Sequence, residues 1–256
     1  MKKSQILKGK KITKTLELVV ARRAAAVMTH IAAGKWKTTN VNFTVGSGNA
    51  IHMSIDNNEP QGPINVQVDQ PVGISFEHES ERYIFETMVI GFEPTVNQNQ
   101  TGEIMFVIPE KMEKMGRRAY LRQDVPDTLK VKVLFWHRGY NDDRTEVPLE
   151  NYWQGRLINL SAGGVKLAIA LGQAPNFEIG QIVGLQFTPM PYEKPITLEG
   201  QVKHFENTAD GSELILGVHA LGLEANSQGR IILHRIIDVV NRYQQLNLPQ
   251  NHPVTV

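Results

Sequence analysis

The sequence of 256 residues contains no cysteine. This absence excludes disulfide bonds, thiolate zinc sites and cysteine nucleophiles. No apolar run approaches the roughly 18 residues that a membrane-spanning helix needs. The first five residues are not followed by the apolar core of a signal peptide. The eight histidines are scattered, and none forms a metalloprotease-like pair. We therefore expect a cytoplasmic protein without a metal site, a cofactor or a transmembrane segment.

Signatures of catalysis are missing as well. The sequence has no glycine-rich phosphate loop that opens a helix and no nucleophile elbow. Its carboxylates are spread over expected strands and loops without a spacing that pairs any two of them. We expect no catalytic residues and predict that the protein is not an enzyme.

The charges of the two signs are unevenly distributed, although the net charge is only +1. Residues 1–40 contain ten Lys and Arg but a single acid, Glu17. Residues 41–109 contain one basic residue, Arg82, and nine acids, whereas residues 110–256 contain sixteen of each sign. Such asymmetry indicates separate segments with different partners.

The basic head of the chain shows one helical pattern. Apolar residues recur at mostly helical spacing over 13–33, and Gly34 followed by Lys35 and Lys37 is typical of a helix C-terminus. Near the other end of the chain, Asn226 or Ser227 can cap a second helix, whose apolar stripe extends to Tyr243.

The rest of the chain favours strands. Apolar residues alternate with polar ones in two series, separated by turn-rich segments and by a polar connector. The first series covers 41–45, 51–55, 64–68, 72–76, 83–91 and 103–108, and the second covers 129–135, 153–160, 164–168, 181–187, 196–205 and 213–221.

Together these patterns predict an all-β protein with an N-terminal and a C-terminal helix. Its two antiparallel β-barrels follow one another along the chain. The expected boundaries are a basic helical segment over 1–40, a first barrel over 41–109, a hinge connector over 110–122, a second barrel over 123–246 and a tail over 247–256.

Two short motifs stand out against this background. Arg118-x-x-x-Arg122, preceded by Arg117, lies on the connector, and Asn159-x-Ser161-x-x-Gly164 lies at the end of an expected strand. Each alone has an ordinary explanation, as a solvated linker or a polar turn. Their joint occurrence in this composition is expected only about 0.03 times per chain.

In this order and spacing, the motifs resemble the signature of the PilZ domain. The resemblance covers about residues 115–245 and implies a six-stranded β-barrel with a C-terminal helix that binds cyclic di-GMP. The preceding barrel and the arginine connector are similar to the two-domain, flagellar-brake (YcgR-like) branch of this family. There an N-terminal split barrel precedes the PilZ domain.

The resemblance also implies roles for the motif residues. Arginine can donate two hydrogen bonds to a phosphate or to a guanine edge and can stack on a base. Arg118 and Arg122 are therefore the expected phosphate and guanine contacts. We expect Asn159 to bind a guanine edge, Ser161 to reach a phosphate or fix the turn, and Gly164 to let the backbone approach the ligand or to take a positive φ. Arg117 either faces solvent or supports a second ligand molecule.

The function implied is that of a cyclic di-GMP receptor that changes its interdomain arrangement and regulates motility through a protein partner such as a flagellar motor component. The basic head leaves three interpretations: a solvated arm, docking on the acidic barrel within one chain or in a homodimer, or an external acidic partner. If that partner is DNA, the chain is a cyclic di-GMP-dependent transcription regulator, which we rank lower because no helix-turn-helix is apparent. A subunit of an exopolysaccharide-producing enzyme is a third class.

Overall fold

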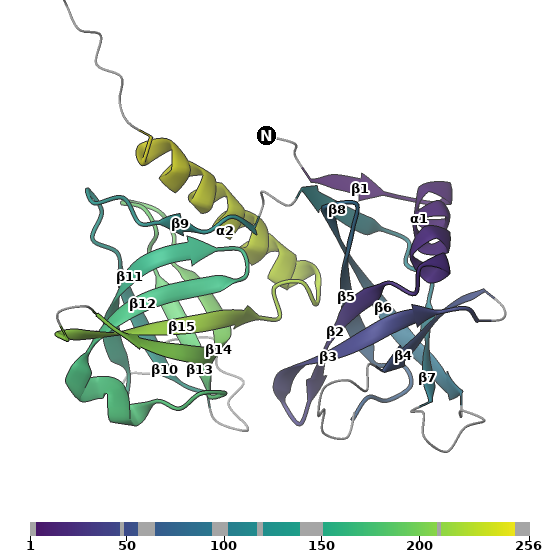
Figure 1. The fold of residues 1–256 in the computed structure, drawn as a ribbon, viewed down its shortest axis with the longest axis horizontal. Helices are drawn as coiled ribbons and strands as arrows, with labels where there is room; N and C mark the ends of the chain where they lie inside the picture. The colour runs from purple at the N-terminus through teal and green to yellow at the C-terminus, as the bar shows by residue number, and fades with distance from the viewer. Residues whose placement is uncertain are drawn as a thin grey trace, which may run out of the picture. The chain divides into compact units, whose positions relative to one another are not determined.

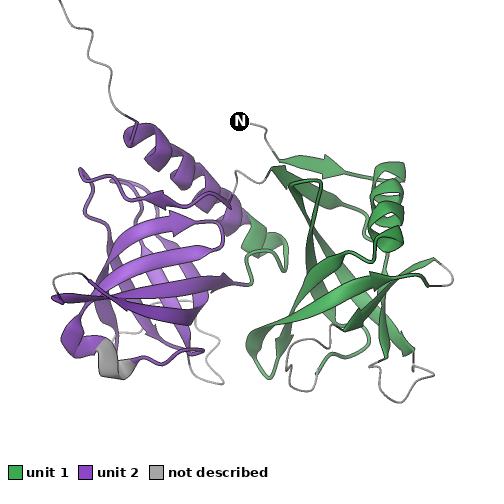
Figure 2. Cartoon of the chain, viewed as in Figure 1, with its two compact units in different colours: residues 1–119, 222–230 green, residues 120–221, 231–256 purple. Residues whose placement is uncertain are grey.

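A computed structural model describes residues 4–46, 49–55, 65–93, 102–116, 120–138, 151–208 and 211–248. The chain divides into two compact units, coloured separately in Figure 2. The first comprises Met1–Ala119 and Gly222–Arg230, and the second comprises Tyr120–Leu221 and Ile231–Val256. In the described residues, each unit contains a closed six-stranded antiparallel barrel, so the predicted fold class is confirmed.

The barrel of the first unit closes in the strand order β6-β5-β2-β3-β4-β7, with β7 pairing back to β6 (Figure 1). Strands β8 and β1 extend the sheet beyond β6. The elements are β1 (Gln5–Leu7), α1 (Lys10–Ala21), β2 (Ala25–Ala32), β3 (Lys35–Thr44), β4 (Ala50–Ile55), β5 (Pro71–His78), β6 (Glu81–Glu93), β7 (Glu103–Val107) and β8 (Met112–Gly116).

Helix α1 contributes one apolar face to the core of this barrel. Ile12, Leu16 and Val19 are buried at helical spacing and join the same hydrophobic cluster as Phe43 and Met53. The opposite face, which carries the lysines, remains exposed. The helix therefore covers the core with one side and presents positive charge with the other.

The helix predicted over 13–33 is wrong in its second half, because α1 ends at Ala21 and residues 25–32 form β2. Arg23 has a positive φ of 47°, which breaks the helix. Strand β2 then pairs with both β3 and β5. Ala33 and Gly34, expected as a helix end, form the two-residue turn between β2 and β3, with positive φ at both positions.

Two further expectations in this unit are corrected. The run expected as a strand over 64–68 has no strand in its described residues 65–68, although Val66 is buried in the core. Residues 112–116, expected in a polar connector, form β8, which pairs with β6 and β1. Met112 and Met115 are almost fully buried, so burial of their side chains outweighs the polar character of their neighbours.

The second barrel closes in the order β10-β13-β14-β15-β12-β11, with β11 pairing back to β10 and the short β9 added to β11 (Figure 1). Its strands fall within a few residues of the second predicted series. The elements are β9 (Gln123–Asp124), β10 (Lys132–His137), β11 (Trp153–Ser161), β12 (Gly164–Ala170), the 3-10 helix η2 (Leu171–Asn176), β13 (Ile182–Phe187), β14 (Ile196–Asn207), β15 (Glu213–Leu221) and α2 (Ser227–Leu246).

Helix α2 begins where the sequence predicted. The Asn226 side chain accepts a hydrogen bond from the Gly229 backbone N–H at 2.8 Å, the arrangement of an N-cap. Near the other end, the buried Tyr243 hydroxyl donates to the Pro189 carbonyl at 2.7 Å. Burial, together with the nearby Glu193, raises the pKa of Tyr243, so the hydroxyl keeps its proton and its donor role. Neither this helix nor any other in the described chain is long and apolar enough to cross a membrane.

The segment Gly222–Arg230, which leads from β15 into α2, belongs to the first unit. Arg82 donates two hydrogen bonds of 2.7 Å to the carboxylate of Glu224 and one of 3.1 Å to Ser75. At Gly73 an added Cβ would lie 2.4 Å from the Cα atom of Ala225, so only glycine permits this close approach. Arg82, the single basic residue of the acidic stretch, thus holds a segment far along the chain against the first barrel.

We expect Arg82→Ala and Glu224→Ala each to reduce the stability of the first unit by about 2 kcal/mol, because each leaves a half-buried charge without its bidentate partner. The double variant should show a coupling energy of at least about 1 kcal/mol. Guanidinium unfolding of 5-fluorotryptophan-labelled protein measures this, since Trp36 lies in the first unit and Trp136 and Trp153 lie in the second.

The Arg156–Glu213 pair of the second unit is the matched control. It has the same 2.7 Å separation, but its side chains are 53% and 36% exposed. Its disruption should cost less than about 1 kcal/mol. Equal losses for the two pairs would contradict the role assigned to Arg82.

Candidate functional site

The second predicted motif forms the turn between β11 and β12. Ser161 and Gly164 are paired across a two-residue turn, and the Ser161 hydroxyl donates to the Gly164 carbonyl at 3.2 Å. The carbonyl of Gly163 accepts a hydrogen bond from the Ala220 N–H of β15 at 3.0 Å. The hairpin end is therefore held by both of its strands and by a third.

Gly164 fits this position for two physical reasons. Its φ is +152°, which side chains rarely tolerate, and a Cβ there would lie 2.2 Å from the Val218 carbonyl oxygen of β15. The positive φ, one of the two alternatives expected from the sequence, is present, and approach of the backbone to a ligand stays a prediction. The close approach is to the neighbouring strand, so it shapes the hairpin itself.

Asn159 lies on β11 two residues before Ser161 and is only 7% exposed. Its side-chain oxygen Oδ1 has no hydrogen-bond partner among the described residues. Its backbone is opposite Lys166 on β12 and Asp124 on β9, next to a register shift in β11. A buried carbonyl that lacks a donor is costly, so this oxygen is ready to accept a hydrogen bond from a ligand.

Strand β9 brings the arginine motif to the same place. Gln123 and Asp124 pair with Leu160 and Asn159, and the Val125 N–H donates to the Ile158 carbonyl at 2.9 Å. Arg122 directly precedes Gln123, and Ser161 directly follows Leu160, the partner of Gln123. The Asn247 side chain also donates to the Asp124 carbonyl at 2.9 Å, which ties β9 to the residue that follows α2.

The structure therefore places three of the six predicted site residues, Asn159, Ser161 and Gly164, in one hairpin, and the exposed Arg122 directly before the strand that pairs with β11. Arg117 and Arg118 lie outside the described residues. The roles assigned to all six remain predictions.

Two neighbours of the site carried no motif in the sequence. Asp124 is opposite Asn159, and the exposed His219 is opposite Gly164 on β15. In the sequence, the position of Asp124 two residues after Arg122 is the one signal that it lies near the site. His219 is more than fifty residues from either motif, so only the barrel closure reveals it.

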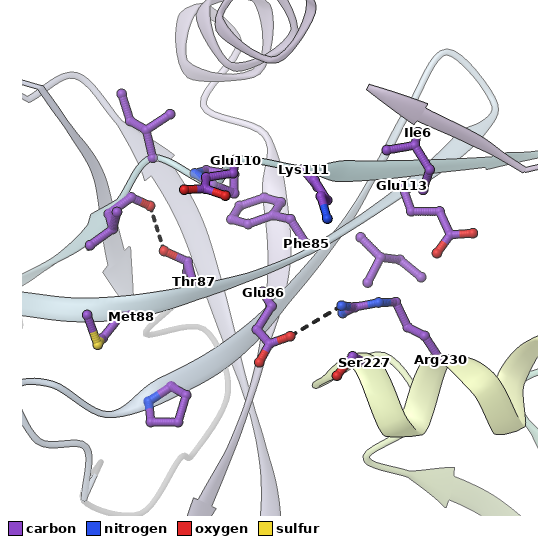
Figure 3. A pocket seen from close by; sticks show the side chains of 15 residues that line it. Ile6, Phe85, Glu86, Thr87, Met88, Glu110, Lys111, Glu113, Ser227 and Arg230 are labelled. Atoms are coloured by element: carbon purple, nitrogen blue, oxygen red, sulfur yellow. Dashed lines mark hydrogen bonds and ion pairs between the residues drawn. The ribbon is translucent and has the colours of Figure 1, made fainter. Parts of the chain in front are cut away.

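A pocket of about 560 Å³ lies in the first unit and includes none of the predicted site residues. Figure 3 shows Glu86 and Arg230 facing one another there, with an ion-pair distance of 3.2 Å. Glu110, Lys111 and Glu113 also line it, beside apolar side chains. This mixture of both charge signs does not define a ligand.

A family model matches this part of the sequence. Residues 116–238 match the model described as the PilZ domain. The second barrel is thus a PilZ domain, as the resemblance predicted. No curated protein matches the sequence.

Solved structures extend the likeness to both barrels. The apo state of MrkH from K. pneumonia is 11% identical, with a TM-score of 0.53 over 95% of this chain and 99% of that one. A second crystal form of MrkH is 12% identical, with a TM-score of 0.52 over 96% and 98%. At these identities the likeness shows the fold. YcgR from Escherichia coli in complex with c-di-GMP is 14% identical over 94% of each chain. Its TM-score of 0.35 is too low for a structural comparison.

Gly164→Ala should destabilise the second unit by about 2 to 4 kcal/mol, because the methyl group meets the Val218 carbonyl and the backbone conformation is strained. Gly163→Ala is the matched control, since the atom nearest to its added Cβ is the Ser161 hydroxyl at 4.0 Å. Denaturant unfolding followed by the fluorine signals of Trp136 and Trp153 separates the two. Equal stability of both variants would show that the hairpin adjusts to the methyl group.

Proposed function

We propose that the chain is a non-enzymatic receptor for cyclic di-GMP, which binds at the β11–β12 hairpin and the arginine segment before β9. The observation that supports this most is the pairing of β9 with β11 within a PilZ domain, because Arg122 directly precedes β9 and both Asn159 and Ser161 lie on β11.

The chemistry of these residues suits that ligand. Cyclic di-GMP offers two phosphodiesters and two guanine bases. Guanine donates hydrogen bonds from its N1–H and N2–H groups, and the buried Asn159 oxygen lacks a donor among the described residues. Arg122 can bind a phosphate or the O6 and N7 atoms of guanine. Arg118, assigned from the sequence motif, supplies a second guanidinium four residues earlier.

The same ligand would act on the segment that joins the two units. Arg117 and Arg118 lie in sequence between Gly116, where β8 of the first unit ends, and Tyr120, where the second unit begins. A ligand held by these arginines and by the hairpin restricts this segment. The ligand can shift the equilibrium between two interdomain arrangements only by as much as its affinities for the two arrangements differ. We propose that this shift regulates motility through a protein partner.

Arg122→Ala and Asn159→Ala should weaken cyclic di-GMP binding, by about 100-fold for the arginine and about tenfold for the asparagine, since charged hydrogen bonds contribute about twice as much free energy as neutral ones. Isothermal titration calorimetry measures both affinity and stoichiometry. Two ligand molecules per wild-type chain and one per Arg117→Ala chain would support a second ligand at Arg117.

Arg156→Ala is the control, because Arg156 lies on β11 as well but pairs with Glu213. Its affinity should equal that of the wild type. Small-angle scattering of the same proteins tests the switch: the wild type should change its radius of gyration on adding ligand and Arg122→Ala should not. Wild-type affinity in Arg122→Ala would defeat the assigned site, whereas binding without a change in scattering would defeat only the switch.

A transcription regulator is the second candidate, and the exposed basic face of α1 favours it. Lys10, Lys11 and Lys14 are exposed there, with Arg22 and Arg23 following the helix. DNA binding through this face should weaken steeply with salt and strengthen with cyclic di-GMP. A gel-shift assay with Lys10, Lys11 and Lys14 changed to Gln decides between the two functions. No ligand-stimulated DNA binding by the wild type leaves the protein-partner function.

A further inference from the structure

A histidine and two glutamates come together on the outer face of the first barrel. His52 on β4 alternates with Ile51 and Met53, which point into the core, so its side chain points outward. Its Nδ1 atom lies 3.4 Å from a carboxylate oxygen of Glu103 on β7 and 3.9 Å from one of Glu93 on β6. One potential ligand atom from each residue lies within 4.8 Å of the other two.

The imidazole is buried despite its outward direction. The side chain of His52 is 1% exposed, and an added Cβ on Gly46 would overlap the imidazole ring at 1.9 Å. The backbone at Gly46 therefore covers the ring and limits its movement. A ligand atom held in one orientation before binding costs little entropy to use.

A cation would stabilise the two facing carboxylates. Glu93 and Glu103 are directly opposite in the register of β6 and β7, and facing like charges destabilise an antiparallel pair. No lysine or arginine within the described residues pairs with either carboxylate at ion-pair distance. Arg82, the single basic residue of the surrounding acidic stretch, binds Glu224 instead.

We propose that His52, Glu93 and Glu103 form a binding site for a divalent transition-metal ion of the Zn²⁺ type. Neutral imidazole nitrogen and carboxylate oxygen are both ordinary zinc ligands. Tetrahedral bonds of about 2.1 Å place ligand atoms about 3.4 Å apart, close to the His52–Glu103 separation. An imidazole ligand favours transition metals over Mg²⁺ and Ca²⁺, which prefer oxygen alone.

Such an ion would join three strands of one barrel at a single point. It would neutralise the facing carboxylates and hold β4, β6 and β7 together. Glu93 is 49% exposed, so the ion can enter from solvent and keep a water ligand. This site lies in the first unit and does not depend on the proposed cyclic di-GMP site.

The test is calorimetric titration of the untagged, chelator-treated full-length chain with ZnCl₂ at neutral pH. We expect one saturating Zn²⁺ per chain, with no competition from Mg²⁺ at the same concentration. Glu103→Gln and Glu93→Gln should each weaken Zn²⁺ binding at least tenfold, because each removes a charged ligand. The fluorine signal of Trp36 checks that the first unit of each variant remains folded.

Glu79→Gln is the matched control. His78 is also buried and lies 3.7 Å from Glu79, but that pair has one carboxylate rather than two. Its Zn²⁺ affinity should equal that of the wild type. Wild-type affinity in both Glu103→Gln and Glu93→Gln would overturn the proposal. So would a wild-type chain that binds no Zn²⁺.

Discussion

The pairing of β9 with β11 is the interaction on which the candidate site depends. Two residues, Gln123 and Asp124, add a short strand to the closed barrel, and Arg122 directly precedes this strand, which pairs with the last part of β11 before the hairpin of Ser161 and Gly164. On the other side of Arg117 and Arg118, β8 ends at Gly116 in the sheet of the first unit. The arginine motif is thus attached at each end to a strand whose register is fixed within its own unit.

The first unit depends on a part of the chain that lies beyond the whole second barrel. Glu224 reaches Arg82, and Ala225 approaches Gly73 so closely that no side chain fits there. A protein cut after β8 would lose this segment. Leaving the half-buried carboxylate of Glu224 without a partner would be destabilising, and Arg82, the single basic residue of the acidic stretch, supplies that partner.

Charge has different consequences at different places in the first unit. On α1 the lysines are exposed and available to a partner, whereas Arg82 is committed to Glu224. Where β6 and β7 bring Glu93 and Glu103 face to face, His52 is the neighbouring group, and the proposed ion would bind there. The excess of acidic residues over 41–109 therefore determines specific side-chain interactions as well as the net charge of that stretch.

The sequence by itself determined the all-β class, most strands of the second barrel, the Asn226 cap and the PilZ motif, because alternation, capping and turn chemistry act between near neighbours. It failed where distant strands decided the outcome. Residues 25–32 look helical in isolation but are held as a strand by β3 and β5, and residues 112–116 look like a linker but bury two methionines against the sheet. The convergence of Arg122 with Asn159, of Arg82 with Glu224, and of His52 with Glu93 and Glu103 arises only from barrel closure, since pairing between strands joins residues whose separation along the chain carries no local signal.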